Sequence, residues 1–237
     1  MLSIIIPVYN EESYIKKVVE SVLSLEMDKE IIVVDDGSTD STFNILEFSF
    51  QDKIKIVRNP RNYGKGYAIR QGLNLCEGDI VAFQDADYEY PPENLSFLYR
   101  AFKSGNFDSV IGVRTVNWDY LNRLSIGSIV ANRIIHKLSG LPDVFSGQRI
   151  IKRKVLENLD VTTSGFDIET EITLKLLNSG YRIKWEPIKY YPRTRKEGKK
   201  IGAFDFFAIM YKYLQLRKEY KKAKKRAARP VESGNVS

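Results

Sequence analysis

Apolar runs and amphipathic segments alternate along the first part of the chain. Residues 2–8 are almost entirely apolar, and apolar side chains then recur at helical spacing between residues 11 and 25. Three more apolar runs of the same kind follow at 30–34, 54–57 and 79–84. Strands that alternate with helices in this way predict an α/β fold, a doubly wound and mostly parallel sheet with helices on both faces.

The later part of the chain is less regular but continues the same elements. Further strands are expected at 109–113, 148–151 and 182–190, and helices at 67–75, 91–103, 120–139 and 168–179, with an earlier helix that ends near residue 48. In sheets of this kind ligands bind at the carboxyl ends of the strands. The loops that follow the first four strands should therefore meet at one edge.

Composition places the protein in a reducing compartment and shows where its charge lies. Cys76 is the only cysteine, which excludes a disulfide framework and favours the cytosol. The start of the chain does not read as a secretory signal, and residues 201–216 are interrupted by polar residues, so no membrane span is expected. Eight Lys or Arg and one acid lie between Arg217 and Arg229, and this segment alone accounts for the net charge of +7.

Three acids that alternate after the fourth predicted strand are the most informative polar cluster. They are Asp85, Asp87 and Glu89. If the backbone stays extended beyond the strand, their carboxylates point the same way. Carboxylates that close together suit Mg²⁺ or Mn²⁺, which can bridge the oxygens of a diphosphate. A solvated acidic turn is the plainer interpretation, but the position after a buried strand favours a metal site.

Two further loops are expected at the same edge of the sheet. Asp35 and Asp36 end the second predicted strand, and helix capping by the following residues gives no reason for two adjacent acids. Asp36 could accept hydrogen bonds from a base or a ribose. The loop with Lys65 between two glycines is similar to a phosphate cradle, although it fits no standard phosphate-binding motif, so a nucleotide contact for Lys65 is only one of two interpretations.

Five ordered blocks resemble family 2 of the glycosyltransferases, enzymes of GT-A fold, and within it the polyprenyl-phosphate (dolichol-phosphate) hexosyltransferases. The blocks are Ser3–Glu11, Val33–Asp40, Gln84–Asp87, Gly165–Ile172, and Tyr191–Arg193 with Glu197–Ile201. The last two are similar to the lipid-phosphate branch in particular. The resemblance implies an inverting transfer of a hexose from a donor of the GDP-mannose or UDP-glucose type to a polyprenyl phosphate.

The resemblance also implies a role for particular residues. Base and ribose would lie against Pro7, Tyr9, Glu11 and Asp36. The metal and the diphosphate would be held by Asp85 and Asp87, with Ala86 between them, and Glu89 would complete the metal site. Arg193 and Lys199 would bind the donor diphosphate, and catalysis would rest on Asp87, Arg114 and Arg193.

A lipid-phosphate acceptor needs fixed cations beside the reacting sugar. Arg114 and Arg123 are placed to supply them, and Ser128, which shares a helix face with Asn132, could add a hydrogen bond. A phosphate is already ionised at neutral pH and needs no catalytic base. If the acceptor is instead a sugar hydroxyl, Asp143 and Glu171 are the candidate bases.

The expected organisation is a catalytic domain over residues 1–200, an amphipathic helix over 201–220 and a basic, disordered tail over 221–237. The helix and tail either hold the enzyme on an anionic membrane surface at the cytosolic face or pack on the domain. A separate membrane-anchored partner is a further option. A nucleotidyltransferase should have a glycine-rich loop after its first strand, and this chain lacks one. A nucleic-acid-binding protein should be basic over the whole domain, whereas the net charge here lies in the tail, so no nucleic-acid partner is expected.

Overall fold

The computed structural model describes residues 1–115, 141–194 and 210–218. Its sheet has seven strands in the order β3-β2-β1-β4-β6-β5-β7, and only β6 runs antiparallel to its neighbours. The strands are β1 (Leu2–Val8), β2 (Lys29–Asp35), β3 (Lys55–Arg58), β4 (Ile80–Phe83), β5 (Ser109–Thr115), β6 (Arg149–Lys152) and β7 (Ile183–Lys189). The expected doubly wound, mostly parallel α/β fold is confirmed.

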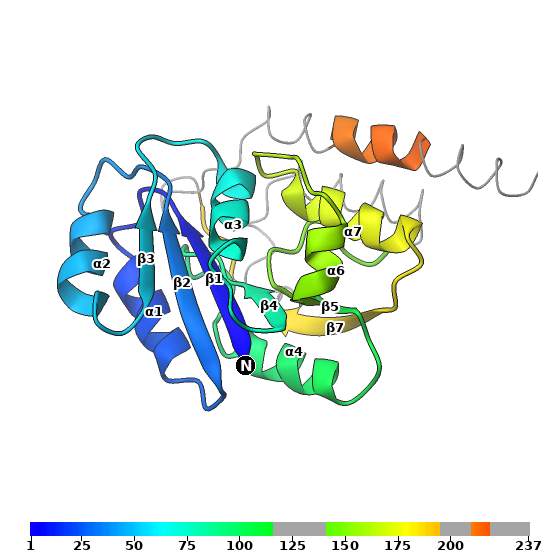
Figure 1. The fold of residues 1–237 in the computed structure, drawn as a ribbon, viewed down its shortest axis with the longest axis horizontal. Helices are drawn as coiled ribbons and strands as arrows, with labels where there is room; N and C mark the ends of the chain where they lie inside the picture. Colours follow the sequence, from blue (N-terminus) through cyan, green and yellow to red (C-terminus); the bar gives the residue numbers. More distant parts are fainter. Residues whose placement is uncertain (116–140, 195–209, 219–237) are drawn as a thin grey trace, which may run out of the picture.

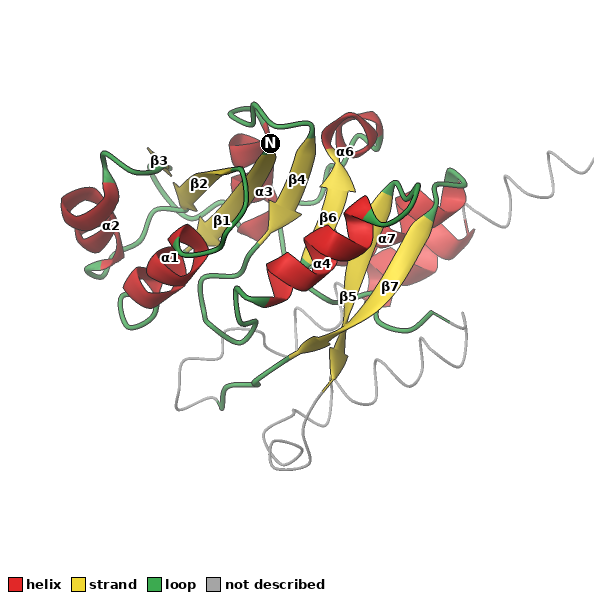
Figure 2. Cartoon of the chain, turned by 90° about the horizontal axis from the view of Figure 1, so that it is seen from below, coloured by secondary structure: helices red, strands yellow, loops and turns green. Residues whose placement is uncertain are grey.

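Helices cover both faces of this sheet (Figures 1 and 2). They are α1 (Ile15–Leu23), α2 (Thr42–Phe50), α3 (Lys65–Leu73), α4 (Asn94–Lys103), α6 (Arg153–Asn158) and α7 (Ile168–Asn178). The sequence pattern did not predict α6, which is only six residues long and follows β6 without a loop. The helix expected at 120–139 lies outside the described residues.

Two hydrophobic layers divide the core according to the alternation of β1. Ile4 and Ile6 belong to the layer that also contains the buried faces of α1, α2 and α4. Ile5 points to the other side and belongs to the layer with α3, α6 and α7. Successive side chains of a strand point to opposite faces, so a strand that is buried on both sides must be apolar throughout. This requirement explains why all but one of the residues of β1 are apolar.

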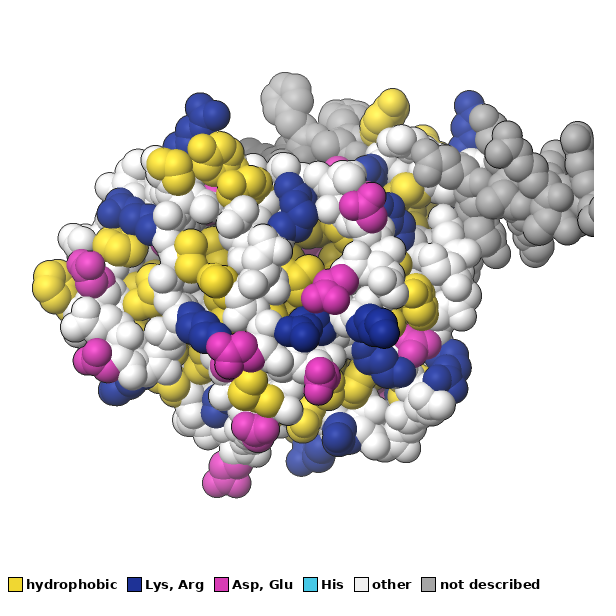
Figure 3. Space-filling model, viewed as in Figure 1, with side chains coloured by type: hydrophobic (Ala, Val, Ile, Leu, Met, Phe, Trp, Pro, Cys, Tyr) yellow, Lys and Arg dark blue, Asp and Glu magenta, His cyan; other side chains and the backbone are white. Residues whose placement is uncertain are grey.

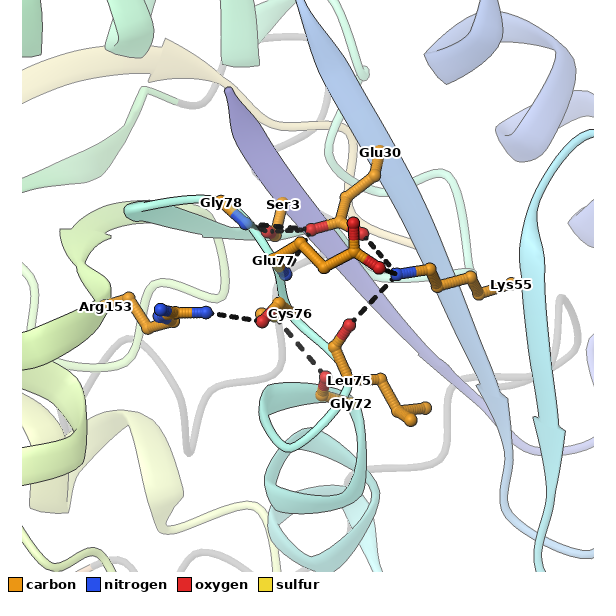
Figure 4. A network of polar contacts seen from close by, with 9 residues as sticks. All are labelled: Ser3, Glu30, Lys55, Gly72, Leu75, Cys76, Glu77, Gly78 and Arg153. Atoms are coloured by element: carbon orange, nitrogen blue, oxygen red, sulfur yellow. Dashed lines mark hydrogen bonds and ion pairs between the residues drawn. The ribbon is translucent and has the colours of Figure 1, made fainter.

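A polar network ties together the amino ends of the first four strands (Figure 4). Glu30 accepts hydrogen bonds from the Ser3 hydroxyl, from Lys55 Nζ at 2.8 Å and from the backbone N–H groups of Glu77 and Gly78 at 2.6 and 3.0 Å. Burial alone would raise the pKa of Glu30, but these bonds outweigh it and lower the pKa to about 2. The network lies at the end of the sheet away from the predicted ligand edge.

Residues 210–218 form a helix with one buried side and one exposed side. Tyr213 and Leu216 are buried in a small cluster with Val144 and Leu174. Tyr211 and Leu214 on the other side are 72% and 53% exposed. The helix therefore packs on the domain with one side and presents apolar side chains on the other, and its association with a membrane stays a prediction. No helix among the described residues has the length and apolarity to cross a bilayer.

Candidate active site

The carboxyl ends of β1, β2 and β4 bring the predicted site residues to one edge (Figure 1). Val8 is paired with Asp35 in the neighbouring strand, and Ile5 is paired with Phe83. The residues that follow these strands therefore start from adjacent positions. Pro7 is buried within β1, whereas Tyr9 and Asp85 are half-buried just beyond the strand ends.

The segment after β4 turns sharply instead of remaining extended. Tyr88 has a φ of 61°, and the backbone N–H of Glu89 donates to Asp87 Oδ1 at 3.0 Å. The premise that alternation along an extended strand aligns the three acids is therefore wrong. A side-chain hydrogen bond to the backbone two residues on is typical of aspartate in turns. This turn brings Asp87 and Glu89 close together by a different route.

Asp87 carries a carboxylate whose negative charge is poorly compensated. Burial raises its pKa to about 7, and repulsion from Glu89 and Asp85 acts in the same direction. Arg193 lowers the pKa but does not cancel these effects. A carboxylate in this state gains stability from any further cation that approaches it.

Arg193 lies in the middle of the acidic cluster. Its guanidinium makes a bidentate pair with Glu11, at 2.9 and 3.0 Å, and lies 3.3 Å from Asp87 Oδ2. Its Nε is 3.6 Å from Glu89 Oε1. The side chain is only 9% exposed. The bidentate pair with Glu11 is a strong, charge-assisted interaction, and a guanidinium can also present donors to an anion.

Lys65 joins the same cluster from the other side. Its Nζ lies 2.5 Å from Asp85 Oδ1 and 2.6 Å from Glu169 Oε1, and these two carboxylates raise its pKa despite its burial. The glycines on either side of Lys65 permit close packing against the backbone of residues 163–165. A Cβ at Gly64 would lie 2.3 Å from the carbonyl oxygen of Ser164. The nucleotide contact of Lys65 stays a prediction.

The donor set and its charge fit a divalent cation. Five carboxylates, on Glu11, Asp85, Asp87, Glu89 and Glu169, face the two cations Lys65 and Arg193. When all are ionised, three negative charges remain, and hard carboxylate oxygens are the ligands that Mg²⁺ and Mn²⁺ prefer. In the described ranges no three acidic, His or Cys side chains converge as a ready-made metal site. The assignment of Asp85, Asp87 and Glu89 as ligands stays a prediction.

Asp36 organises the loop that follows β3. It is 3% exposed, and its carboxylate accepts hydrogen bonds from Asn59 Nδ2 at 2.7 Å and from the backbone N–H groups of Tyr63 and Gly64. A cavity of about 460 Å³ opens beside this loop, and its lining residues are Gly37, Ser38, Thr39, Arg58, Asn59 and Pro60. The direct contact of Asp36 with a base or ribose stays a prediction.

Arg114 is held in place by Asp143. The two side chains form a bidentate pair at 2.7 and 2.9 Å, and the backbone N–H of Arg114 donates to the same carboxylate at 3.2 Å. Arg114 also lies 5.3 Å from the centre of the Tyr190 ring. Lys199, Arg123, Ser128 and Asn132 lie outside the described residues.

Glu171, the other candidate base, is fully engaged in the fold. It is 1% exposed, accepts a hydrogen bond from the backbone N–H of Thr163 at 2.9 Å, and lies 3.0 Å from Lys175 Nζ. Burial alone would raise its pKa, but these partners lower it to about 2. A carboxylate with so low a pKa is a poor acceptor of protons near neutral pH.

Sequence reasoning missed two residues of this site, Glu169 and Tyr190. Glu169 is 4% exposed and pairs with Lys65. A signal existed, because acids at 167, 169 and 171 open a helix that is otherwise largely apolar. Tyr190 lies at the end of β7 and donates a hydrogen bond from its hydroxyl to Glu89 Oε2. Nothing in its sequence neighbourhood distinguishes it from a core aromatic.

Comparison with known proteins decides the family. Residues 3–160, more than half of the chain, match the family described as Glycosyl transferase family 2. The chain belongs to glycosyl transferase family 2. This is the family that the ordered motifs predicted.

Relatives within the family include lipid-phosphate transferases by name. The chain is 31% identical over 228 residues to "Dolichol-phosphate mannosyltransferase" of Pyrococcus furiosus, a match that covers 90% of this chain and 64% of that protein. It is 37% identical over 147 residues to "Undecaprenyl-phosphate 4-deoxy-4-formamido-L-arabinose transferase" of Proteus mirabilis, which covers 59% of this chain and 44% of that protein. The chain thus spans less than two thirds of the length of these two relatives.

Solved structures support the fold. Glucosyl-3-phosphoglycerate synthase of Mycobacterium tuberculosis in complex with UDP superposes with a TM-score of 0.73 at 20% identity, over 91% of this chain and 79% of that one. The same enzyme has been solved with Mg²⁺ and UDP, with a TM-score of 0.70 at 22% identity over 91% of this chain and 79% of that one. At these identities the likeness shows a shared GT-A-like architecture.

Proposed function

We propose that this family 2 enzyme transfers a hexose from a nucleotide sugar to a polyprenyl phosphate, with inversion at the anomeric carbon. The observation that carries the proposal is the acidic cluster at the carboxyl ends of β1 and β4, with its excess negative charge and its buried Arg193. An edge of this kind is where doubly wound sheets bind ligands. The names of the polyprenyl-phosphate relatives support the acceptor class.

On the donor side, Asp85 and Asp87 would hold Mg²⁺ or Mn²⁺, and Glu89 would be the third ligand. Such an ion stabilises a diphosphate as a leaving group. Arg193 is positioned beside Asp87 and would turn its donors to the diphosphate, together with Lys199. Base and ribose would lie near Pro7, Tyr9, Glu11 and Asp36, next to the cavity lined by residues 37–39 and 58–60.

On the acceptor side, Arg114 would bind the lipid phosphate, with Arg123 and Ser128 as further contacts. The bidentate pair with Asp143 fixes the Arg114 guanidinium, so its orientation is set before the acceptor arrives. Both candidate bases are engaged elsewhere, Asp143 by Arg114 and Glu171 by Thr163 and Lys175. This arrangement favours a phosphate acceptor, which needs no base, over a sugar hydroxyl.

Membrane association would come from the helix at 210–218 and the basic residues after it. Tyr211 and Leu214 are exposed apolar side chains on one side of that helix. An apolar face followed by a cluster of cations is typical of segments that bind an anionic membrane surface. The cytosolic face is the expected side, because Cys76 is a free thiol. On the domain face shown in Figure 3, Lys and Arg side chains are interspersed with Asp and Glu side chains.

The experiment that tests this function is a transfer assay. Purified protein is incubated with radiolabelled GDP-mannose, UDP-glucose and other sugar nucleotides, with Mg²⁺ or Mn²⁺, and with dolichyl or undecaprenyl phosphate. We expect label in the organic phase with one donor, and its loss in Asp87→Ala. Transfer to a sugar acceptor without any transfer to polyprenyl phosphate would contradict the proposed acceptor class.

A further inference from the structure

The segment that follows β7 is held to the acidic turn by one residue, Glu89. The Tyr190 hydroxyl donates to Glu89 Oε2, and the backbone N–H of Arg193 donates to Glu89 Oε1 at 3.0 Å. The backbone N–H of Tyr191 donates to the carbonyl oxygen of Glu89 at 2.9 Å. Three hydrogen bonds thus tie the segment from Tyr190 to Arg193 to one residue, which is 6% exposed.

The ring of Tyr190 lies on the acceptor side of the same turn. It packs against Tyr90 with the ring centres 4.9 Å apart, and the Arg114 guanidinium lies 5.3 Å from its centre. Tyr190 is 5% exposed, so its hydroxyl is largely shielded from water. One side chain therefore contacts both the residue that holds Arg193 and the cation proposed for the acceptor.

We propose that Tyr190 is a positioning residue for transfer: its hydroxyl fixes Glu89, and Glu89 in turn holds Arg193 beside Asp87. The inference rests on the proposed function, because it assigns Arg193 to the donor diphosphate. A purely structural tyrosine would need only its ring, which phenylalanine supplies. The hydroxyl is buried and donates to the Glu89 carboxylate, which contacts both the backbone N–H and the side-chain Nε of Arg193. Loss of the hydroxyl should therefore loosen the position of Arg193.

The first test is Tyr190→Phe, which keeps the ring contacts with Tyr90 and Arg114. Calorimetry with GDP and with UDP, each with Mg²⁺, measures diphosphate binding without catalysis. A hydrogen bond to a charged group is lost, so we expect the dissociation constant of the bound nucleotide to rise about tenfold. The matched control is Tyr99→Phe, because Tyr99 is half-buried in the core and its hydroxyl makes no hydrogen bond within the described ranges. It should bind as the wild type does.

The second test is a double-mutant cycle with Arg193→Ala. If Tyr190 acts through Arg193, Tyr190→Phe weakens binding in the wild-type background and has almost no further effect once Arg193 is gone. Additive losses in binding, or a loss explained by a lower melting temperature, would overturn the inference. Should Arg193→Ala not fold, Arg193→Lys closes the cycle in the same way, because lysine cannot reproduce the bidentate pair with Glu11.

The controls separate this inference from the proposed function. If the wild-type protein binds nucleoside diphosphate and Tyr190→Phe binds equally well, the positioning role is wrong and the proposed function stands. If the wild-type protein binds neither GDP nor UDP with Mg²⁺, both are wrong. In the transfer assay the expected signature is a higher KM for the sugar nucleotide with a smaller change in the KM for polyprenyl phosphate.

Discussion

Asp87 should destabilise the metal-free protein when it is ionised, and Asp87→Asn should relieve this cost. The pKa of Asp87 is raised from 3.8 to about 7, so the folded protein binds more protons than the unfolded chain between those pH values. Stability contributed by the protonated form is therefore lost as pH rises through this window. Above pH 7 the full difference corresponds to about 4 kcal/mol.

The measurable gain is smaller than this figure. The Asp87 side chain keeps 24% of its surface exposed, and asparagine places an amide next to the Arg193 guanidinium. We expect about half the difference, roughly 2 kcal/mol, which for a chain of this length raises the melting temperature by about 4–8 °C. The amide oxygen can still accept the hydrogen bond from the backbone N–H of Glu89. The turn is therefore retained.

Thermal unfolding with a chelator at pH 5 and pH 8 measures the effect. Asp87→Asn should melt above the wild type at pH 8 and close to it at pH 5, where Asp87 is mostly protonated, and it should lose transfer. The matched control is Asp52→Asn, an exposed aspartate far from the cluster in sequence, which should change neither value. An Asp87→Asn protein that melts below the wild type at pH 8 would refute the electrostatic reasoning.

Three further changes test other parts of the account. Glu30→Gln should destabilise the fold by up to about 3 kcal/mol above pH 5, because folding lowers the pKa of Glu30. The wild type should lose this advantage as pH falls from 4.5 towards 2. Equal denaturant midpoints of the two proteins at pH 7 would contradict this. Gly147→Ala should lower donor binding at least tenfold, because its Cβ would lie 2.4 Å from Asp85 Oδ2; unchanged calorimetric affinity would refute the assigned role of Asp85. Truncation after Leu216 should weaken sedimentation with anionic liposomes, more at low than at high salt, and unchanged sedimentation would discard the membrane role of the tail.

Hydrophobic pattern predicted the architecture because burial on both faces leaves a strong signal. Apolar runs such as residues 2–8 are required for a parallel strand that is covered on both faces. The helices between the strands were predicted from the helical spacing of their apolar residues. Short elements carry little pattern, and α6 was missed for that reason. The start of the first helix also differs from the prediction, since residues 11–14 precede α1 and belong to a turn.

The sequence indicated candidate site residues but not how their side chains pair. The motifs indicated Glu11, Asp87 and Arg193 separately, yet Glu11 and Arg193 are 182 positions apart, and only the fold shows that they form a bidentate pair. The geometry of the acidic turn was also beyond the pattern, because it depends on the positive φ of Tyr88. Long-range pairs and single unusual backbone angles leave no periodicity from which they could be predicted.

In the proposed function, the acidic edge of the sheet binds a sugar nucleotide with the help of a divalent cation. Isothermal titration of GDP-mannose and UDP-glucose into the protein, with Mg²⁺ and with a chelator, tests it most directly. We expect one nucleotide to bind at least tenfold more tightly with Mg²⁺, and Asp87→Asn to abolish this difference. Equal affinity with and without the cation, or no binding of any sugar nucleotide, would contradict it.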